Sequence, residues 1–233
     1  MKDYAGSQIR NVAVLSHDGA GKTAVVENLL ATTGAIEGVG TGADNKHVLD
    51  FEPEEIKRNV TIQLGLAPCE WKGYKLNFID TPGYGEFSGE VRAALRACDG
   101  ILIIVSAESG VEVDTQRAWD YGDELALPRM IFINKMDAEQ ANYDKTLAEM
   151  RERFGKTVMP LHLPLGEGKD FHGIIDIVKM KATVWENGQE TEIDIPEEWR
   201  EGASGGSDMA VEAAAGGDDI LLEKYLDGGE LTV

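Results

Sequence analysis

An apolar run, a glycine-bearing turn and a helical pattern follow one another directly within the first 34 residues. The run at 11–15 is apolar enough to form a buried strand. The turn at 16–23 reads Ser-His-Asp-Gly-Ala-Gly-Lys-Thr. After it, apolar residues recur at helical spacing from Val25 to Leu30, and Gly34 is a suitable helix C-cap. Strand, turn and helix in this order form the context that a phosphate-binding loop requires.

The turn itself has the residues to bind an anion. Its backbone N–H groups converge, and the N-terminus of the following helix adds partial positive charge. Lys22 would supply a point charge to the β- and γ-phosphates of a nucleotide, and Thr23 a hydroxyl to Mg²⁺. The motif GxxxxGK[ST] begins with glycine, where this chain has Ser16. The predicted nucleotide-binding residues of this loop are Asp18, Gly19, Ala20, Gly21, Lys22 and Thr23.

Charge and apolar patterning narrow the classes of function. The formal net charge of −20 argues against binding a nucleic-acid backbone through the overall field. We therefore expect no direct sequence-specific nucleic-acid binding. The N-terminus has no signal-peptide pattern, and the longest apolar run, 101–105, is too short to span a bilayer. A cytoplasmic protein without a membrane partner is expected.

Strands alternate with helices over residues 1–155. Alternating apolar residues at 60–66 predict a half-buried strand, which should pair antiparallel with a second strand at 74–79. Two further apolar runs predict buried strands, and helical patterns separate them; these segments are 100–105 and 130–133 for the strands, and 113–125 and 142–154 for the helices. This alternation predicts an α/β fold with a doubly wound, mostly parallel sheet covered on both faces.

The pattern changes at about residue 156. Short strands are expected at 158–163, 173–178, 182–185 and 191–195, with a hairpin turn at 187–188. The glycine-rich stretch 202–207 predicts a flexible loop, and a last helix is expected at about 220–226. We therefore expect a core domain at 1–155 and a small α+β subdomain at 156–233.

Asp80 lies directly after the strand at 74–79, in the sequence Asp-Thr-Pro-Gly. At a strand end its carboxylate could hold Mg²⁺ through the water shell of the ion. The backbone N–H of Gly83 could then meet the γ-phosphate, because glycine has no side chain to obstruct the approach. The alternative is an acidic turn between a strand and a helix.

Asn134-Lys135-Met136-Asp137 follows a buried strand, where open α/β sheets bind ligands. The Asp137 carboxylate can accept the ring N–H and the exocyclic amine of guanine. Adenine lacks this pair of donors, which disfavours an ATP-using enzyme. Asn134 would brace the loop, and Lys135 would lie along the base. These residues predict a site for GTP and GDP.

Thr61 follows a long polar stretch, 35–58, that has no sustained periodicity. A loop of this length inside a compact domain is usually functional or mobile. Thr61 could offer its hydroxyl to Mg²⁺ only while a γ-phosphate holds the loop closed. The predicted metal ligands are therefore Thr23, Thr61 and Asp80, and the predicted catalytic groups include Lys22, Thr61 and Gly83.

Together these motifs resemble the GTP-binding domain of elongation factor G. The resemblance is carried by Arg-x-x-Thr-Ile at 58–62, Asp-Thr-Pro-Gly at 80–83, Ser-Gly-Glu-Val-Arg-Ala-Ala-Leu-Arg at 88–96, Asn-Lys-Met-Asp at 134–137 and Leu-Leu-Glu-Lys-Tyr-Leu at 221–226. It implies a P-loop GTPase core with an inserted α+β subdomain, a nucleotide-binding position for His17, and a partner in the ribosome.

Four departures from the family pattern qualify the expected activity. The chain has Tyr84 where the family usually has a water-orienting histidine, and a phenol with a pKa near 10 cannot replace an imidazole at neutral pH. Tyr84 is counted among the predicted catalytic residues at the position of that histidine. It and Gly19, where the family has aspartate, resemble a divergent, elongation factor G-like branch. Ser16 and the glycine-rich stretch 202–207 also differ. The family continues beyond residue 233 into a last core strand and a Ser-Ala guanine loop, so the resemblance implies a truncated core.

Two hypotheses follow from these departures. In the first, the chain is a GTP-binding switch domain that hydrolyses GTP slowly. In the second, it is a nucleotide-dependent binding module with negligible hydrolysis, because Tyr84 cannot orient water.

Overall fold

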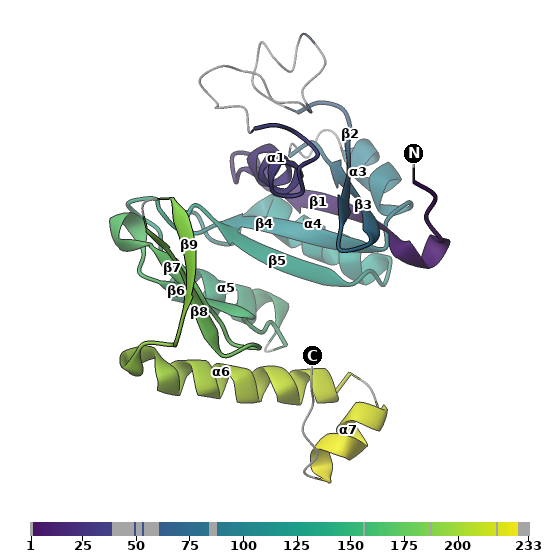
Figure 1. Cartoon of the computed structure of the whole chain (residues 1–233). Coiled ribbons are helices and arrows are strands. Elements are labelled where there is room, and N and C mark those ends of the chain that lie inside the picture. Colours follow the sequence, from purple (N-terminus) through teal and green to yellow (C-terminus); the bar gives the residue numbers. More distant parts are fainter. Residues whose placement is uncertain are drawn as a thin grey trace. The chain divides into compact units, whose positions relative to one another are not determined.

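The structure, a computed structural model, describes residues 2–38, 49, 53, 61–83, 88–155, 157–186, 188–217 and 219–227. The chain divides into two compact units, Met1–Lys135 and Met136–Val233 (Figure 1). This division falls earlier than the expected boundary at 155/156.

The first unit contains a five-stranded sheet. Its elements in chain order are η1 (Gly6–Gln8), β1 (Ile9–Ser16), α1 (Lys22–Thr32), β2 (Gly65–Trp71), β3 (Tyr74–Asp80), α3 (Ser88–Leu95), β4 (Gly100–Ser106), α4 (Val113–Glu124) and β5 (Arg129–Asn134). The strand order is β2-β3-β1-β4-β5. β1 pairs parallel with both β3 and β4, β4 pairs parallel with β5, and β2 pairs antiparallel with β3. The predicted mostly parallel α/β sheet is confirmed.

The strand expected at 60–66 is displaced along the chain. β2 begins only at Gly65, and the described residues 61–64 form no strand. The strand predicted from the alternation of apolar residues at 61–64 is therefore wrong. Local periodicity reports which side chains alternate, but a strand also needs a neighbour for its backbone hydrogen bonds.

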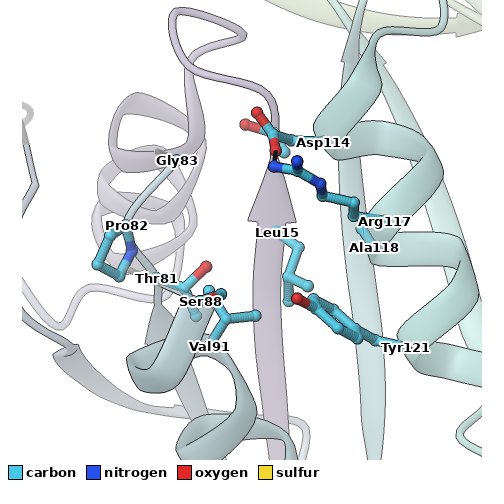
Figure 2. A pocket seen from close by; sticks show the side chains of 11 residues that line it. Leu15, Thr81, Pro82, Gly83, Ser88, Val91, Asp114, Arg117, Ala118 and Tyr121 are labelled. Carbon is cyan, nitrogen blue, oxygen red and sulfur yellow. Dashed lines mark hydrogen bonds and ion pairs between the residues drawn. The ribbon is translucent and has the colours of Figure 1, made fainter. Parts of the chain in front are cut away.

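Helices cover both faces of this sheet. Val14 packs in one core cluster with Val26 and Leu30 of α1. The next residue of β1, Leu15, lines a cavity with Val91 of α3 and with residues of α4 (Figure 2). Because successive strand residues point to opposite faces, α1 lies on one face of the sheet and α3 and α4 lie on the other.

The second unit contains a four-stranded antiparallel sheet in the order β6-β7-β8-β9. Its elements in chain order are α5 (Tyr143–Phe154), β6 (His162–Leu165), η3 (Gly168–Asp170), β7 (Gly173–Asp176), β8 (Lys181–Glu186), β9 (Gln189–Ile193), α6 (Glu197–Ala215) and α7 (Asp219–Leu226). The four strands lie within a few residues of the predicted ones. Of the predicted hairpin turn, Asn187 lies outside the described residues. No helix in the described part of the chain is long and apolar enough to cross a membrane.

Hydrogen bonds explain why α5 groups with the later residues. The backbone N–H of Tyr143 donates to Glu167 Oε1 at 2.6 Å, and its hydroxyl donates to the His162 carbonyl at 3.0 Å. The Gly168 N–H donates to the Met136 carbonyl at 2.8 Å. The segment at 136–154 is therefore bonded to the α+β part, which sequence periodicity could not indicate.

The loop expected at 202–207 is wrong, because α6 is a continuous helix through this stretch. Ala203 is fully buried in the core cluster of the second unit, and Ala210 packs against that cluster. A Cβ at Gly206 would lie 3.4 Å from Ile177 Cδ1, so this face of the helix sits close to the sheet. Glycine disfavours helix, but tertiary packing of one helix face outweighs that propensity.

Candidate functional site

Four strands of the first unit end at the same edge of the sheet. In the register, Val14 pairs with Asp80, Ser16 with Ile104, and Ser106 with Asn134. The Thr81 hydroxyl donates to the Val14 carbonyl at 2.8 Å, which ties the segment after β3 to β1. The loop after β1, the segment after β3 and the end of β5 therefore meet at this edge of the sheet.

Gly21 fits the turn for two separate reasons. Its φ is +94°, in the left-handed region that glycine adopts readily. A Cβ at this position would also lie 2.5 Å from Asn134 Nδ2. That amide donates to the Ala20 carbonyl at 2.9 Å, so the end of β5 is bonded to the loop. Asn134 thus connects the end of β5 to the loop.

Lys22 begins α1 and is buried, with 6% of its surface exposed. Its Nζ donates to Ser16 Oγ at 3.1 Å. Burial lowers the pKa of Lys22, while the carboxylates of Asp80, Asp18 and Asp114 act in the opposite direction. Ser16, a departure from the motif, is therefore a hydrogen-bond partner of the lysine.

Gly83 lies beside this ammonium group. A Cβ on Gly83 would lie 2.6 Å from Lys22 Nζ and 3.1 Å from Asp18 Cα. The absence of a side chain is what lets the segment after β3 approach the loop so closely. The structure thus brings Lys22 and Gly83 together.

Three side-chain oxygens meet next to Lys22. The Thr23 hydroxyl donates to Asp80 Oδ2 at 2.8 Å and lies 3.4 Å from Thr61 Oγ1. Asp80 is fully buried. Hydroxyl and carboxylate oxygens are hard ligands of the kind that Mg²⁺ takes, with water completing its shell. The donor set therefore fits a magnesium ion. Among the residues that the structure describes, no group of three or more His, Cys, Asp or Glu side chains could hold a metal.

His17 has partners at the start of α4 that the sequence analysis did not identify. Its Nδ1 lies 2.7 Å from Asp114 Oδ2, and its Nε2 lies 3.4 Å from Glu112 Oε1. Arg117 donates to the other oxygen of Asp114 at 2.7 Å (Figure 2). The loop is thereby attached to the start of α4. The sequence did contain an indication of these contacts. Glu112 and Asp114 follow β4, which is one of the strands that end at this edge of the sheet.

A cavity of about 30 Å³ lies between β1, α3 and α4 (Figure 2). Leu15, Thr81, Gly83, Val91 and Tyr121 are among its lining residues. Sites for small organic ligands usually have volumes of several hundred Å³, so this cavity is too small for a nucleotide. Outside this cavity, the loop after β1 exposes Asp18 and Gly19 to solvent.

The remaining predicted residues are not placed in this constellation. Tyr84 lies outside the described residues, as does most of the stretch 35–58. Lys135 is half-buried and has a φ of +59°. Asp137 belongs to the second unit, where its side chain is exposed.

Comparisons with known proteins agree with this arrangement of motifs. Residues 7–227 match a family model described as the elongation factor Tu GTP-binding domain. Elongation factor G of Thermotoga maritima is 38% identical over 228 residues, which is 97% of this chain and 33% of that protein. Elongation factor G of Thermotoga sp. strain RQ2 matches with the same identity and coverage. The chain thus spans about a third of the length of these relatives.

A solved structure is also similar. A crystal structure of a protein from Thermus thermophilus superposes with a TM-score of 0.90 and 41% identity. The match covers 97% of this chain and 34% of that one.

Proposed function

The chain belongs to the family of elongation factor Tu GTP-binding domains, and from this premise we propose that it is the GTP-binding switch domain of an elongation factor G-like translation factor. The resemblance inferred from the motifs is confirmed at the level of the family. The observation that carries the proposal is the buried ammonium of Lys22, held between Ser16 and Gly83 beside the Thr23–Asp80 hydrogen bond.

In this proposal the first unit binds the phosphates. Lys22 and the backbone N–H groups of 18–23 offset the charge of the β- and γ-phosphates. Thr23, Thr61 and Asp80 would hold Mg²⁺, which would neutralise further phosphate charge when bound. Asn134 keeps the loop in place through the Ala20 carbonyl. These groups position the phosphates and need no covalent step.

The guanine specificity is assigned to Asp137. Its exposed carboxylate would accept two hydrogen bonds from guanine, a pair that adenine cannot supply. Lys135 would lie along the base. Both roles rest on the motif and its position after β5.

Calorimetric titration of the chain with GDP, GTP and ATP in magnesium buffer tests the binding proposal. We expect both guanine nucleotides to bind at least tenfold more tightly than ATP. Lys22→Ala should abolish binding, because the lysine faces the phosphates. Lys145→Ala, which removes an exposed lysine of α5, is the matched control and should bind normally. Equal affinity for ATP and GTP, or normal binding by Lys22→Ala, would disprove the proposal.

Hydrolysis is proposed to be slow, because Tyr84 stands where the family usually has histidine. The alternative is a binding module in which GTP only orders a partner surface. Single-turnover rates of the chain and of Tyr84→His separate the two. A modest change in rate supports a slow GTPase, whereas a large gain over an undetectable rate supports the binding module.

Action on the ribosome in the cytoplasm is a further part of the proposal. It rests on the resemblance to elongation factor G and on the names of the relatives. Co-sedimentation of the chain with ribosomes, with GTP and with GDP, would test it. Pelleting that requires GTP is expected, and absence of pelleting with either nucleotide would count against a ribosomal role for these residues alone.

A further inference from the structure

The hairpin between β2 and β3 presents two aromatic rings at its end. Trp71 and Tyr74 pair directly across the hairpin, so their side chains lie on the same face. Cys69 and Leu76 precede them on that face and pack in the core next to α1. The two rings continue this apolar row but remain 44% and 45% exposed. Both side chains are therefore accessible from solvent at the end of the hairpin.

A cation lies over each ring. The Arg10 guanidinium carbon is 5.7 Å from the centre of the Tyr74 ring, and Lys72 Nζ is 5.7 Å from the centre of the Trp71 ring. The neighbouring acid, Glu70, is already paired with Lys2 at 2.6 Å. This hairpin end is a local basic and aromatic surface on a chain with a formal net charge of −20.

Lys72 adopts a backbone conformation that lysine disfavours. It and Gly73 both have positive φ values, +47° and +84°, the pattern of a type I′ turn. Asparagine is the residue that such a turn favours at the first of these positions. This turn places Lys72 at the tip of the hairpin, beside the Trp71 ring.

We propose that Arg10, Trp71, Lys72 and Tyr74 form a binding surface for single-stranded nucleic acid, such as a loop of RNA. Bases of any sequence would stack on the ring surface that Arg10 and Lys72 leave exposed, and the two cations would meet phosphates. An acidic peptide would satisfy the cations but not the two ring faces. This surface goes beyond the proposed GTP site and does not depend on it.

The expectation of no sequence-specific nucleic-acid binding is compatible with this surface. Stacking is tolerant of sequence. Two phosphate contacts give only weak affinity, because the net charge of the chain has the same sign as the phosphates. Each neutralised phosphate contributes a slope of about −0.7 to the logarithmic salt dependence of single-strand binding. Two contacts predict a loss of about sevenfold in affinity between about 50 and 200 mM salt.

Fluorescence anisotropy with a labelled RNA octanucleotide, with and without saturating GDP, tests the proposal. The full chain should bind the RNA with the stated salt dependence and independently of GDP. Trp71→Leu and Tyr74→Leu should each weaken binding by about tenfold, as expected for loss of one stacked base.

Lys72→Asn is the most informative variant. Asparagine tolerates the positive φ, so the thermal midpoint should be unchanged or higher, while affinity for RNA falls severalfold. Lys169→Asn removes the same charge from an exposed position in the second unit and should leave binding unchanged. This pair separates a binding role from a structural one.

Three results would overturn the proposal. One is RNA affinity of Lys72→Asn equal to that of the unmodified chain. Another is equal affinity for an abasic oligomer, which would show that charge alone is recognised. The third is binding to vesicles of anionic phospholipid without binding to RNA, which would identify a membrane surface instead.

Discussion

At the scale of single residues, the site depends on positions where a side chain does not fit. Gly21 lets the loop after β1 approach Asn134, and Gly83 lets the segment after β3 approach Lys22. A Cβ at these two positions would lie 2.5 Å from Asn134 Nδ2 and 2.6 Å from Lys22 Nζ. Ser16, in turn, supplies a hydroxyl to the Lys22 ammonium at 3.1 Å. The loop is therefore shaped by small residues around one buried cation.

Gly21→Ala should reduce GDP affinity by more than tenfold. Alanine at a φ of +94° costs about 1–2 kcal/mol, and its Cβ would collide with the Asn134 amide. Gly34→Ala is the matched control, because Gly34 lies past the far end of α1 and also has positive φ but no atom within 4 Å of the added Cβ. Calorimetry should therefore show a much smaller loss for Gly34→Ala, and equal losses would contradict the steric argument.

At the scale of elements, α6 shows that a helix can persist through a glycine-rich sequence. Two of its three buried positions, Ala203 and Gly206, lie three residues apart, so they share a face. That face packs on the sheet of the second unit, whereas Gly202 and Gly205 are exposed and have no neighbour within 4 Å of an added Cβ. The helix therefore carries glycine at positions where alanine would fit.

Gly202→Ala and Gly205→Ala should each stabilise the chain by up to about 1 kcal/mol, the difference in helix propensity between glycine and alanine. Gly206→Ala should gain less, because its Cβ would press against Ile177 at 3.4 Å. Urea unfolding of the three variants, followed by circular dichroism, checks this order. Destabilisation by Gly202→Ala would instead indicate that this stretch is not helical in solution.

At the scale of the whole molecule, we expect repulsion between like charges to be the dominant electrostatic effect. The formal net charge is −20, while ion pairs such as Arg92–Glu124 are about half exposed on both sides. Exposed pairs contribute only about 0–1 kcal/mol each. Added salt should therefore weaken the repulsion between like charges more than it weakens the attraction within ion pairs.

The urea midpoint should rise when KCl is increased from about 10 to 150 mM, because the Debye length falls from about 30 to 8 Å. A neutral osmolyte at equal osmolality serves as the control for solvent effects. A midpoint that falls with KCl would mean that attractive ion pairs outweigh the repulsion.

The sequence by itself determined the strand–turn–helix at the N-terminus, the parallel character of the first sheet and the strand ends that carry Asp80 and Asn134. These features follow from local information, since apolar spacing and turn residues lie within a few positions of one another. The family also followed from such motifs. By contrast, the sequence left the role of Tyr84 and the guanine contacts of Asp137 as predictions.

Only the tertiary structure decided which segments belong together. His17 meets Asp114 across 97 positions, and Arg10 lies over Tyr74 from a neighbouring strand. The same holds for α5, which is bonded to the second unit, and for α6, whose packing outweighs its glycines. Each of these outcomes depends on contacts between residues far apart in the chain. Local sequence patterns do not predict the energies of such contacts.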